Sequence, residues 1–210
     1  MSEYIILKNG GEGLYEEKKS RFIAAAYVVN SEEEAYTIIE SVKKKYWDAR
    51  HNCHAFVIGN NNEVTRCSDD GEPSGTAGKP ILEVILGMEI HNCLVVVTRY
   101  FGGTLLGTGG LVRAYTKAAK DALLGSSLAK VVPGIEYIVT ADYTHVGKIQ
   151  RIAADNDAVI TGTDYAADVT FTISVHKDVD MVKLITEGTN GKATVNKNRD
   201  LSIEIPYVPD

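Results

Sequence analysis

An uninterrupted run of apolar and β-branched residues, Cys-Leu-Val-Val-Val-Thr, occupies positions 93–98. Such a run lacks the polar alternation of a half-exposed strand and is typical of a strand buried on both faces. We therefore predict a central strand at 93–98. A glycine-rich segment at 102–110 follows it directly, and an alanine-rich helix is expected over 111–124, ended by Gly125.

The rest of the first half alternates strands and helices. Residues 21–29 read as a strand that stops before Ser31, and Ser31 with Glu34 has the spacing of a helix capping box. A helix is expected to begin there, because apolar residues follow at helical spacing and a lysine run lies near its C-terminal end. The other elements expected are hairpin strands at 53–59 and 63–67 and a helix over 79–88.

The second half has the order βαββαβ, which is the pattern of ferredoxin-like domains. The segment Val131-Val132-Pro133-Gly134 is expected to be a linker, because proline and glycine interrupt regular structure. We therefore predict an α+β protein with two domains, 1–130 and 131–210. The elements expected in the second domain are strands at 135–143, 158–164, 169–176 and 201–207 and helices at 144–156 and 179–188.

The chain is acidic overall. Among its 210 residues, 22 Lys and Arg face 28 Asp and Glu, which gives a formal net charge of −6, and most of the excess lies after residue 130. Contact with a polyanion would therefore need a local basic cluster. No apolar run is long enough to span a membrane and no signal peptide is recognisable, so we expect a cytoplasmic protein without a membrane partner.

Three cysteines, Cys53, Cys67 and Cys93, form an odd set without C-x-x-C spacing. This favours reduced thiols at buried or half-buried strand positions over a disulfide framework. Zinc is disfavoured, because strand alternation would put His51 and Cys53 on one face and His54 on the other. A cysteine nucleophile is also disfavoured, because neither an oxyanion donor nor an orienting acid can be assigned. We expect no metal.

A long polar loop, 68–80, joins two apolar elements. Ordering such a loop costs conformational freedom unless its backbone groups find partners, so it either packs closely on the domain or carries a site. Its acidic residues do not have the EF-hand spacing, which argues against a dedicated cation site. The candidate ligand-binding residues of this loop are Asp69, Asp70, Glu72, Ser74 and Lys79.

The segment 99–110 runs from the predicted strand to a helix N-terminus, a context in which backbone N–H groups and the helix dipole bind anions. Its glycine spacing matches neither the P-loop nor the dinucleotide-binding pattern, and glycines that serve only tight turns and close packing remain an alternative. The candidate anion-binding glycines are Gly102, Gly103, Gly107, Gly109 and Gly110. If the two loops meet, the cations that would complement a phosphate are Arg50, His51, Lys79, Arg99 and Arg113.

Three ordered segments resemble the signatures of the YigZ/IMPACT family. They are Asp48-Ala49-Arg50-His51-Asn52-Cys53, the loop from Ser68 to Pro80, and the stretch from Val97 to Tyr115 that contains Arg-Tyr-Phe-Gly-Gly-Thr. These motifs cover the core of residues 18–125. The βαββαβ half is similar to the C-terminal domain of bacterial members, so the resemblance spans nearly the whole chain.

The resemblance implies a fold for each domain. It implies an N-terminal IMPACT domain like domain IV of elongation factor G and a C-terminal ferredoxin-like domain like domain V of that factor. Eukaryotic IMPACT relatives regulate translation under nutrient stress through a regulatory partner that activates an initiation-factor kinase. Their partner-binding region includes a further N-terminal domain that we do not expect here, so that role does not transfer directly.

Three functional hypotheses remain open on the sequence. The first is a regulator related to translation whose N-terminal domain binds RNA, the ribosome or a phosphate-bearing ligand. The second is an enzyme on a phosphorylated or anionic small molecule, with the acidic residues of loop 68–80 as cation ligands or acid–base groups and His51 transferring protons. The third is a module that docks a regulatory protein through its ferredoxin-like domain. No cofactor is expected.

Overall fold

The predicted central strand is β7, Cys93–Tyr100, and it is the middle strand of a five-stranded sheet in the computed structural model, which describes residues 3–209. The sheet order is β2-β3-β7-β4-β5, and every neighbouring pair is antiparallel. The four other strands are β2 (Glu12–Glu17), β3 (Ser20–Val28), β4 (His51–Ile58) and β5 (Val64–Ser68).

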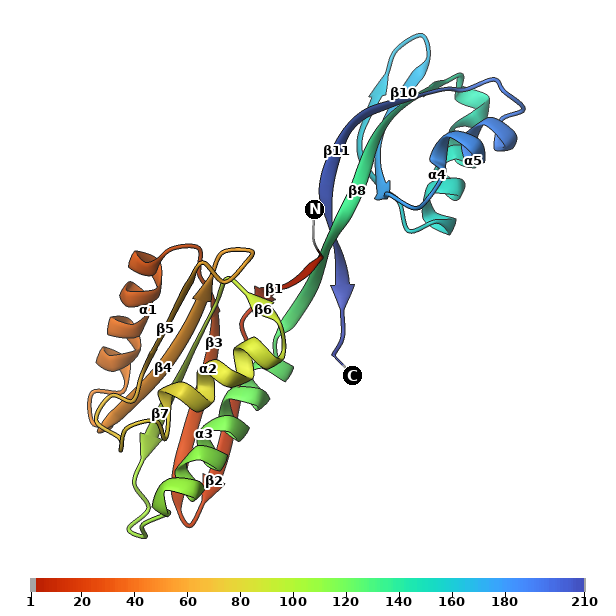
Figure 1. Ribbon diagram of the computed structural model, residues 1–210. Helices are drawn as coiled ribbons and strands as arrows, with labels where there is room; N and C mark the ends of the chain where they lie inside the picture. The colour runs from red at the N-terminus through yellow and green to blue at the C-terminus, as the bar shows by residue number, and fades with distance from the viewer. Residues whose placement is uncertain (1–2, 210) are drawn as a thin grey trace. The chain divides into compact units, whose positions relative to one another are not determined.

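Both faces of this sheet are covered by helices, which explains why β7 has no polar alternation. Val95 and Val97 point into a core shared with α2 and α3, whereas Leu94 and Val96 point into a core shared with α1. Figure 1 shows α2 and α3 side by side on one face of the sheet. The bounds of these helices are Glu32–Lys45 for α1, Gly78–Gly87 for α2 and Gly107–Leu124 for α3.

The capping residues predicted for α1 are in place. The backbone N–H of Glu34 donates to Ser31 Oγ at 3.1 Å, and the Glu34 carboxylate accepts the N–H of Asn30 at 2.8 Å. The carboxylate thus reaches one residue further back than in a standard capping box. Acidic residues fill the first turn and lysines fill the last, as the helix dipole favours.

Three strands of the N-terminal half were not predicted from the sequence. They are short or carry exposed polar residues, so their periodicity is weak; β2, for example, reads Glu-Gly-Leu-Tyr-Glu-Glu. Besides β2, these are β1 (Tyr4–Asn9) and β6 (Ile90–His91), which pair in parallel with Ile5 opposite Ile90.

The second half has the predicted ferredoxin-like topology. Its sheet order is β9-β10-β8-β11. Strands β8 and β9, which a helix connects, are separated by β10, and strands β10 and β11, which another helix connects, are separated by β8, as the βαββαβ fold requires. Helices α4 and α5 contribute Ile149 and Ile185 to its core. The elements are β8 (Ser127–Ala141), a 3₁₀ turn (Tyr143–His145), α4 (Val146–Asp155), β9 (Val159–Tyr165), β10 (Val169–His176), α5 (Met181–Gly188) and β11 (Thr194–Tyr207).

The linker predicted at 131–134 is wrong, because these residues lie inside β8. The strand runs through Pro133, which has no N–H to donate but whose carbonyl accepts the N–H of Lys177 at 3.1 Å. The chain divides into two compact units within β8, between Lys130 and Val131. Residues 206–209, expected in the second domain, group with the first unit.

Across residues 3–209, no helix is sufficiently long and apolar to cross a membrane.

Replacing the α1 cap should measurably destabilise the first unit. In Ser31→Ala, the N–H of Glu34 loses its acceptor, and the free energy of unfolding should fall by about 1 kcal/mol in urea titrations. The control is Ser41→Ala, an exposed position inside the same helix, where alanine should be neutral or slightly stabilising. Equal effects of the two substitutions would contradict the capping assignment.

Candidate anion-binding site

Side chains from two adjacent strands and one loop line a shallow hollow of about 220 Å³ in the N-terminal unit. The lining residues are Arg50, His51, Arg99, Phe101 and Leu105. His51 begins β4 and lies opposite Arg99 near the end of β7, so the sheet register brings the two cationic positions together. Three of the predicted cations thus share one hollow.

Arg99 is the buried member of this set, with 7% of its surface exposed. Its Nη1 lies 2.7 Å from Glu72 Oε1, and its guanidinium lies 5.5 Å from the Phe22 ring centroid and 5.6 Å from that of Phe101. Among the described residues, no acceptor contacts its buried Nε. Glu72 therefore balances the charge of Arg99 while leaving part of the guanidinium unsatisfied.

Glu72 is also the centre of a buried hydrogen-bond network. Its Oε1 accepts the hydroxyl of Tyr115 at 2.8 Å, and the Cys53 thiol donates to Tyr115 at 3.3 Å or to the Asp69 carbonyl at 3.0 Å. Burial raises the pKa of Cys53 well above its usual range, so this thiol stays protonated and is a poor nucleophile. Burial likewise raises the pKa of Tyr115.

Asp69 organises the loop that precedes α2. Its carboxylate accepts the N–H groups of Gly75, Ala77 and Gly78 at 2.8, 3.0 and 2.8 Å. Burial alone would raise the pKa of Asp69, but these three backbone hydrogen bonds outweigh it and lower the pKa below its usual value. The side chain therefore supplies the partners that an ordered polar loop requires.

Asp70 attaches the same loop to β4 and α1. Its carboxylate accepts the N–H of Asn52 at 2.7 Å and forms an ion pair with Lys43 at 3.2 Å. The Asp70 carbonyl lies 2.9 Å from His51 Nδ1, so that nitrogen carries the proton and donates. The other ring nitrogen of His51 is the one left for a ligand in the hollow.

These contacts use the three carboxylates that the sequence offered as cation ligands or acid–base groups. Within residues 3–209, no group of three or more His, Cys, Asp or Glu side chains is arranged to hold a metal ion. Asp69 instead orders the loop itself, Asp70 holds it against β4 and α1, and Glu72 holds it against β7 and α3.

The predicted glycine-rich loop is shorter than expected, because α3 begins at Gly107. Gly102 is required for a close approach, since a Cβ there would lie 2.1 Å from the carbonyl carbon of Lys19. Gly103 and Gly107 have φ values of +85° and +71°, which favour glycine. Gly109 and Gly110 lie in the first turn of α3, and a Cβ at Gly109 would make only an ordinary contact with Arg113.

The first turn of α3 has no side-chain cap. Leu106 occupies the N-cap position and provides no hydrogen-bond acceptor, so the N–H groups of this turn are available to an anion. Arg113 is exposed, and its guanidinium is near Gly109. The turn begins directly after Leu105, which lines the hollow.

The remaining candidates lie outside the hollow. Lys79 is exposed on α2 and pairs with Glu83 at 3.8 Å, and Ser74 is exposed in the loop. Of the cysteines, Cys53 and Cys93 are buried as expected, whereas Cys67 is exposed because it lies on the edge strand β5.

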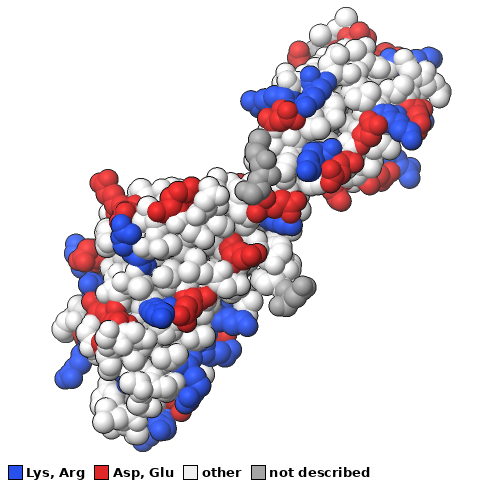
Figure 2. Space-filling model, in the orientation of Figure 1, with Lys and Arg blue, Asp and Glu red and all other residues white. Residues whose placement is uncertain are grey.

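Charge is mixed on the surface shown in Figure 2, without one large field of either sign. Figure 2 shows Lys and Arg side chains along one edge of the N-terminal unit. Helix α3 has three exposed cations, Arg113, Lys117 and Lys120. Lys117 is paired with Asp121 at 2.6 Å. The acidic chain thus retains local basic regions.

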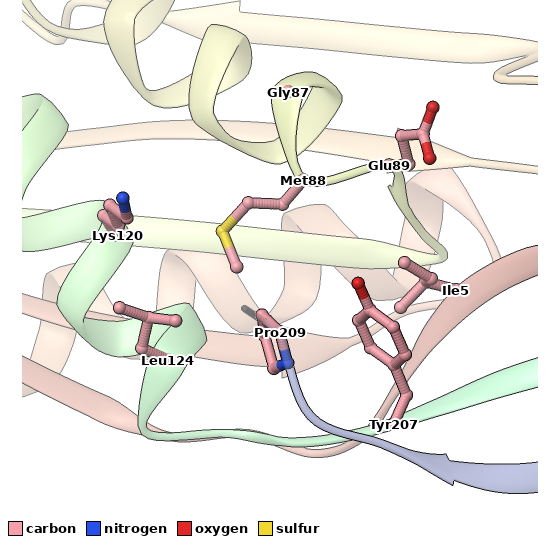
Figure 3. A pocket seen from close by; sticks show the side chains of 8 residues that line it. All are labelled: Ile5, Gly87, Met88, Glu89, Lys120, Leu124, Tyr207 and Pro209. Atoms are coloured by element: carbon pink, nitrogen blue, oxygen red, sulfur yellow. The ribbon is translucent and has the colours of Figure 1, made fainter.

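A second hollow, of about 270 Å³, lies elsewhere in the same unit (Figure 3). Met88, Tyr207 and Pro209 project toward it, and Leu124 and Lys120 of α3 line another side. It contains none of the predicted site residues, and its lining includes both Lys120 and Glu89.

Sequence reasoning missed the members of the network that carry no charge. Tyr115 lies on the alanine-rich face of α3, where an aromatic residue reads as ordinary core. Asn52 lies inside an apolar strand, and its Oδ1 accepts the Thr98 hydroxyl at 2.7 Å. The only available signal was a polar residue at a position that periodicity assigned to the interior.

The fold and these motif-bearing loops define a two-domain α+β protein with an Impact N-terminal domain. The sequence profile of that domain matches residues 18–123, and that of the domain of unknown function DUF1949 matches residues 139–192. The chain belongs to the IMPACT family.

Bacterial relatives match most of the chain. It is 39% identical over 201 residues to IMPACT family member YvyE of Bacillus subtilis, covering 94% of this chain and 92% of that protein. It is 39% identical over 160 residues to IMPACT family member YigZ of Escherichia coli, covering 75% and 78%. A crystal structure of a hypothetical protein, 34% identical, superposes with a TM-score of 0.60 over 93% of this chain and 97% of the other.

The buried pair of Glu72 and Arg99 should dominate local stability. Glu72→Ala leaves a buried guanidinium without its counter-charge, so the free energy of unfolding should fall by about 3–5 kcal/mol. Glu83→Ala removes the exposed partner of Lys79 and should cost less than about 1 kcal/mol. Urea titrations compare the two, and similar losses would contradict the assignment.

The Asp69 carboxylate should stabilise the fold only while it is ionised. Because its folded pKa is below its unfolded value, its contribution is complete above about pH 4 and is lost as the pH falls through the folded pKa. Asp69→Asn should lower the free energy of unfolding by about 1.5–3 kcal/mol at pH 7. Urea titrations at pH 7, 5 and 3 should show this deficit shrinking at the lowest pH; a constant deficit would argue against the ionised acceptor.

Proposed function

We propose that this protein is a cytoplasmic regulator related to translation, and that its N-terminal unit binds RNA, as free RNA or in the ribosome, or another phosphate-bearing ligand. The observation that carries the proposal is the hollow lined by Arg50, His51 and Arg99. The link to translation is supported by the Impact N-terminal domain, whose eukaryotic members the sequence resembles.

The hollow suits a phosphate for three physical reasons. Arg50 is exposed, and among the described residues no carboxylate forms an ion pair with it. Arg99 is held in place by Glu72, so little side-chain entropy is lost when a ligand binds. The uncapped first turn of α3 begins beside Leu105 and adds backbone N–H donors.

The enzyme hypothesis has less support from these contacts. The three carboxylates proposed for acid–base or metal chemistry accept hydrogen bonds from the protein itself. Docking of a regulatory protein by the acidic C-terminal unit is compatible with the proposal, because the two activities would use different units.

Arg50 is the residue to replace, because Arg99→Ala would leave Glu72 buried and unpaired. Arg50→Ala should weaken binding of a fluorescein-labelled, 20-nucleotide single-stranded RNA in anisotropy titrations. It should also reduce the slope of log Kd against log salt concentration by about 0.7, the share of one phosphate contact.

The control is Lys79→Ala, which removes an exposed cation outside the hollow and should leave both quantities unchanged. Unchanged RNA binding by Arg50→Ala would remove the hollow from the proposal. If Arg50→Ala weakens binding, crosslinking and sequencing of RNA bound in cells, with this variant as the reference, would identify the RNA class.

A further inference from the structure

We infer that one end of the N-terminal sheet is a stacking surface for single-stranded RNA, on which Trp47 and Phe101 take unpaired bases and nearby lysines and arginines take the phosphates. We call this surface the aromatic platform. It comprises Trp47, Phe101, Lys18, Lys19, Arg21 and Arg50. The inference rests on the proposed function and specifies the form of RNA that is bound.

Most of the surface of the two aromatic side chains is exposed to solvent. Trp47 is 83% exposed and Phe101 is 54% exposed. Trp47 follows α1, and Phe101 follows β7, so each ring is carried by a connection adjoining a rigid element. Exposed aromatic rings contribute little to the core, but they bind the faces of unstacked bases.

Side-chain contacts place these connections at the same end of the sheet. The Tyr100 hydroxyl donates to Asp48 at 2.7 Å, which ties the residue after Trp47 to the residue before Phe101. The Arg21 guanidinium lies 5.2 Å from the Tyr100 ring centroid. Figure 1 shows the end of α1, the β2–β3 turn and the loop after β7 at this end.

The β2–β3 turn adds two cations at a conformational cost. Glu17 pairs with Ser20, so Lys18 and Lys19 form a two-residue turn, and their φ values are +46° and +65°. Asparagine and glycine are favoured at such positions, because other side chains are strained there. Lysines at these two positions are therefore unfavourable for the turn conformation, but they place positive charge beside Gly102.

The surrounding charge complements a polyanion. Lys18, Lys19, Arg21 and Arg50 are exposed, and Arg50 connects the platform to the hollow. Two carboxylates lie near these cations: Asp48 accepts the Tyr100 hydroxyl, and Glu17 accepts the Tyr15 hydroxyl at 3.1 Å. An acidic protein thus presents cations beside two exposed rings, the combination found in single-strand binding surfaces.

Single-stranded RNA fits this arrangement better than a duplex does. In a duplex the base faces are stacked on one another and cannot reach Trp47 or Phe101. A single strand can turn successive bases outward while its phosphates contact the lysine pair and Arg50. Duplex binding would depend on charge alone and would not involve the rings.

Trp47 is the only tryptophan in the chain, so its fluorescence reports on this position directly. Titration with oligouridylate of ten nucleotides should quench it, and an RNA duplex of the same length should not. Trp47→Ala and Phe101→Ala should each weaken binding of fluorescein-labelled oligouridylate roughly tenfold, and Trp47→Phe should retain most of the affinity.

The matched control is Tyr165→Ala, which removes an aromatic ring that is 62% exposed in the C-terminal unit and should not change binding. Circular dichroism of each variant excludes misfolding as the cause. Labelled RNA that binds with Arg50-dependent affinity, without quenching and equally well to both ring variants, would overturn the platform and leave the proposed function standing. Duplex binding as tight as single-strand binding would also overturn it. No RNA binding at all would overturn the platform and remove RNA from the proposed function, leaving only another phosphate-bearing ligand.

Discussion

The buried ion pair between Glu72 and Arg99 determines how the N-terminal unit is arranged around its site. Glu72 belongs to a long polar loop, and Arg99 belongs to the central strand, so one contact joins segments that would otherwise be independent. Tyr115 extends this contact to α3 and Cys53 extends it to β4. A charge pair of this kind contributes little net stability over an apolar pair, but it allows only one position for the loop.

Local patterns were sufficient where a segment's own side chains decide its structure. The run at 93–98 predicted the central strand, Ser31 and Glu34 predicted the start of α1, and the order of elements predicted the ferredoxin-like unit. Local patterns gave wrong predictions where contacts with a neighbouring element determine the structure. Val131 to Gly134 reads as a linker but lies inside β8, and its last residue, Gly134, pairs with His176 of β10. Gly107 starts a helix despite the glycines around it, because α3 packs its later turns on the sheet.

For the candidate site too, the sequence predicts residue types, whereas tertiary contacts determine which of them come together. The sequence supplied Arg50, His51 and Arg99 as cations, and only the pairing of β4 with β7 brings them into one hollow. Composition could not distinguish a carboxylate that holds a metal from one that accepts backbone N–H groups, since both occur in polar, glycine-rich loops. The Asp69 carboxylate accepts backbone N–H groups. The family to which the chain belongs agrees with the fold, whereas the role of each charged residue is visible only from its partners.

Strand β7 carries both the core and the site. Residues 93–97 fill the two cores that hold the sheet between its helices. Arg99, near the end of the same strand, lines the hollow, and so does Phe101, which follows the strand. The side chains that line the hollow are therefore positioned by buried core residues of the same strand. If the hollow binds the proposed ligand, a partly unfolded molecule that released β7 would lose the binding groups at the same time, and the amount of ligand bound at saturation would equal the amount of protein with an intact sheet.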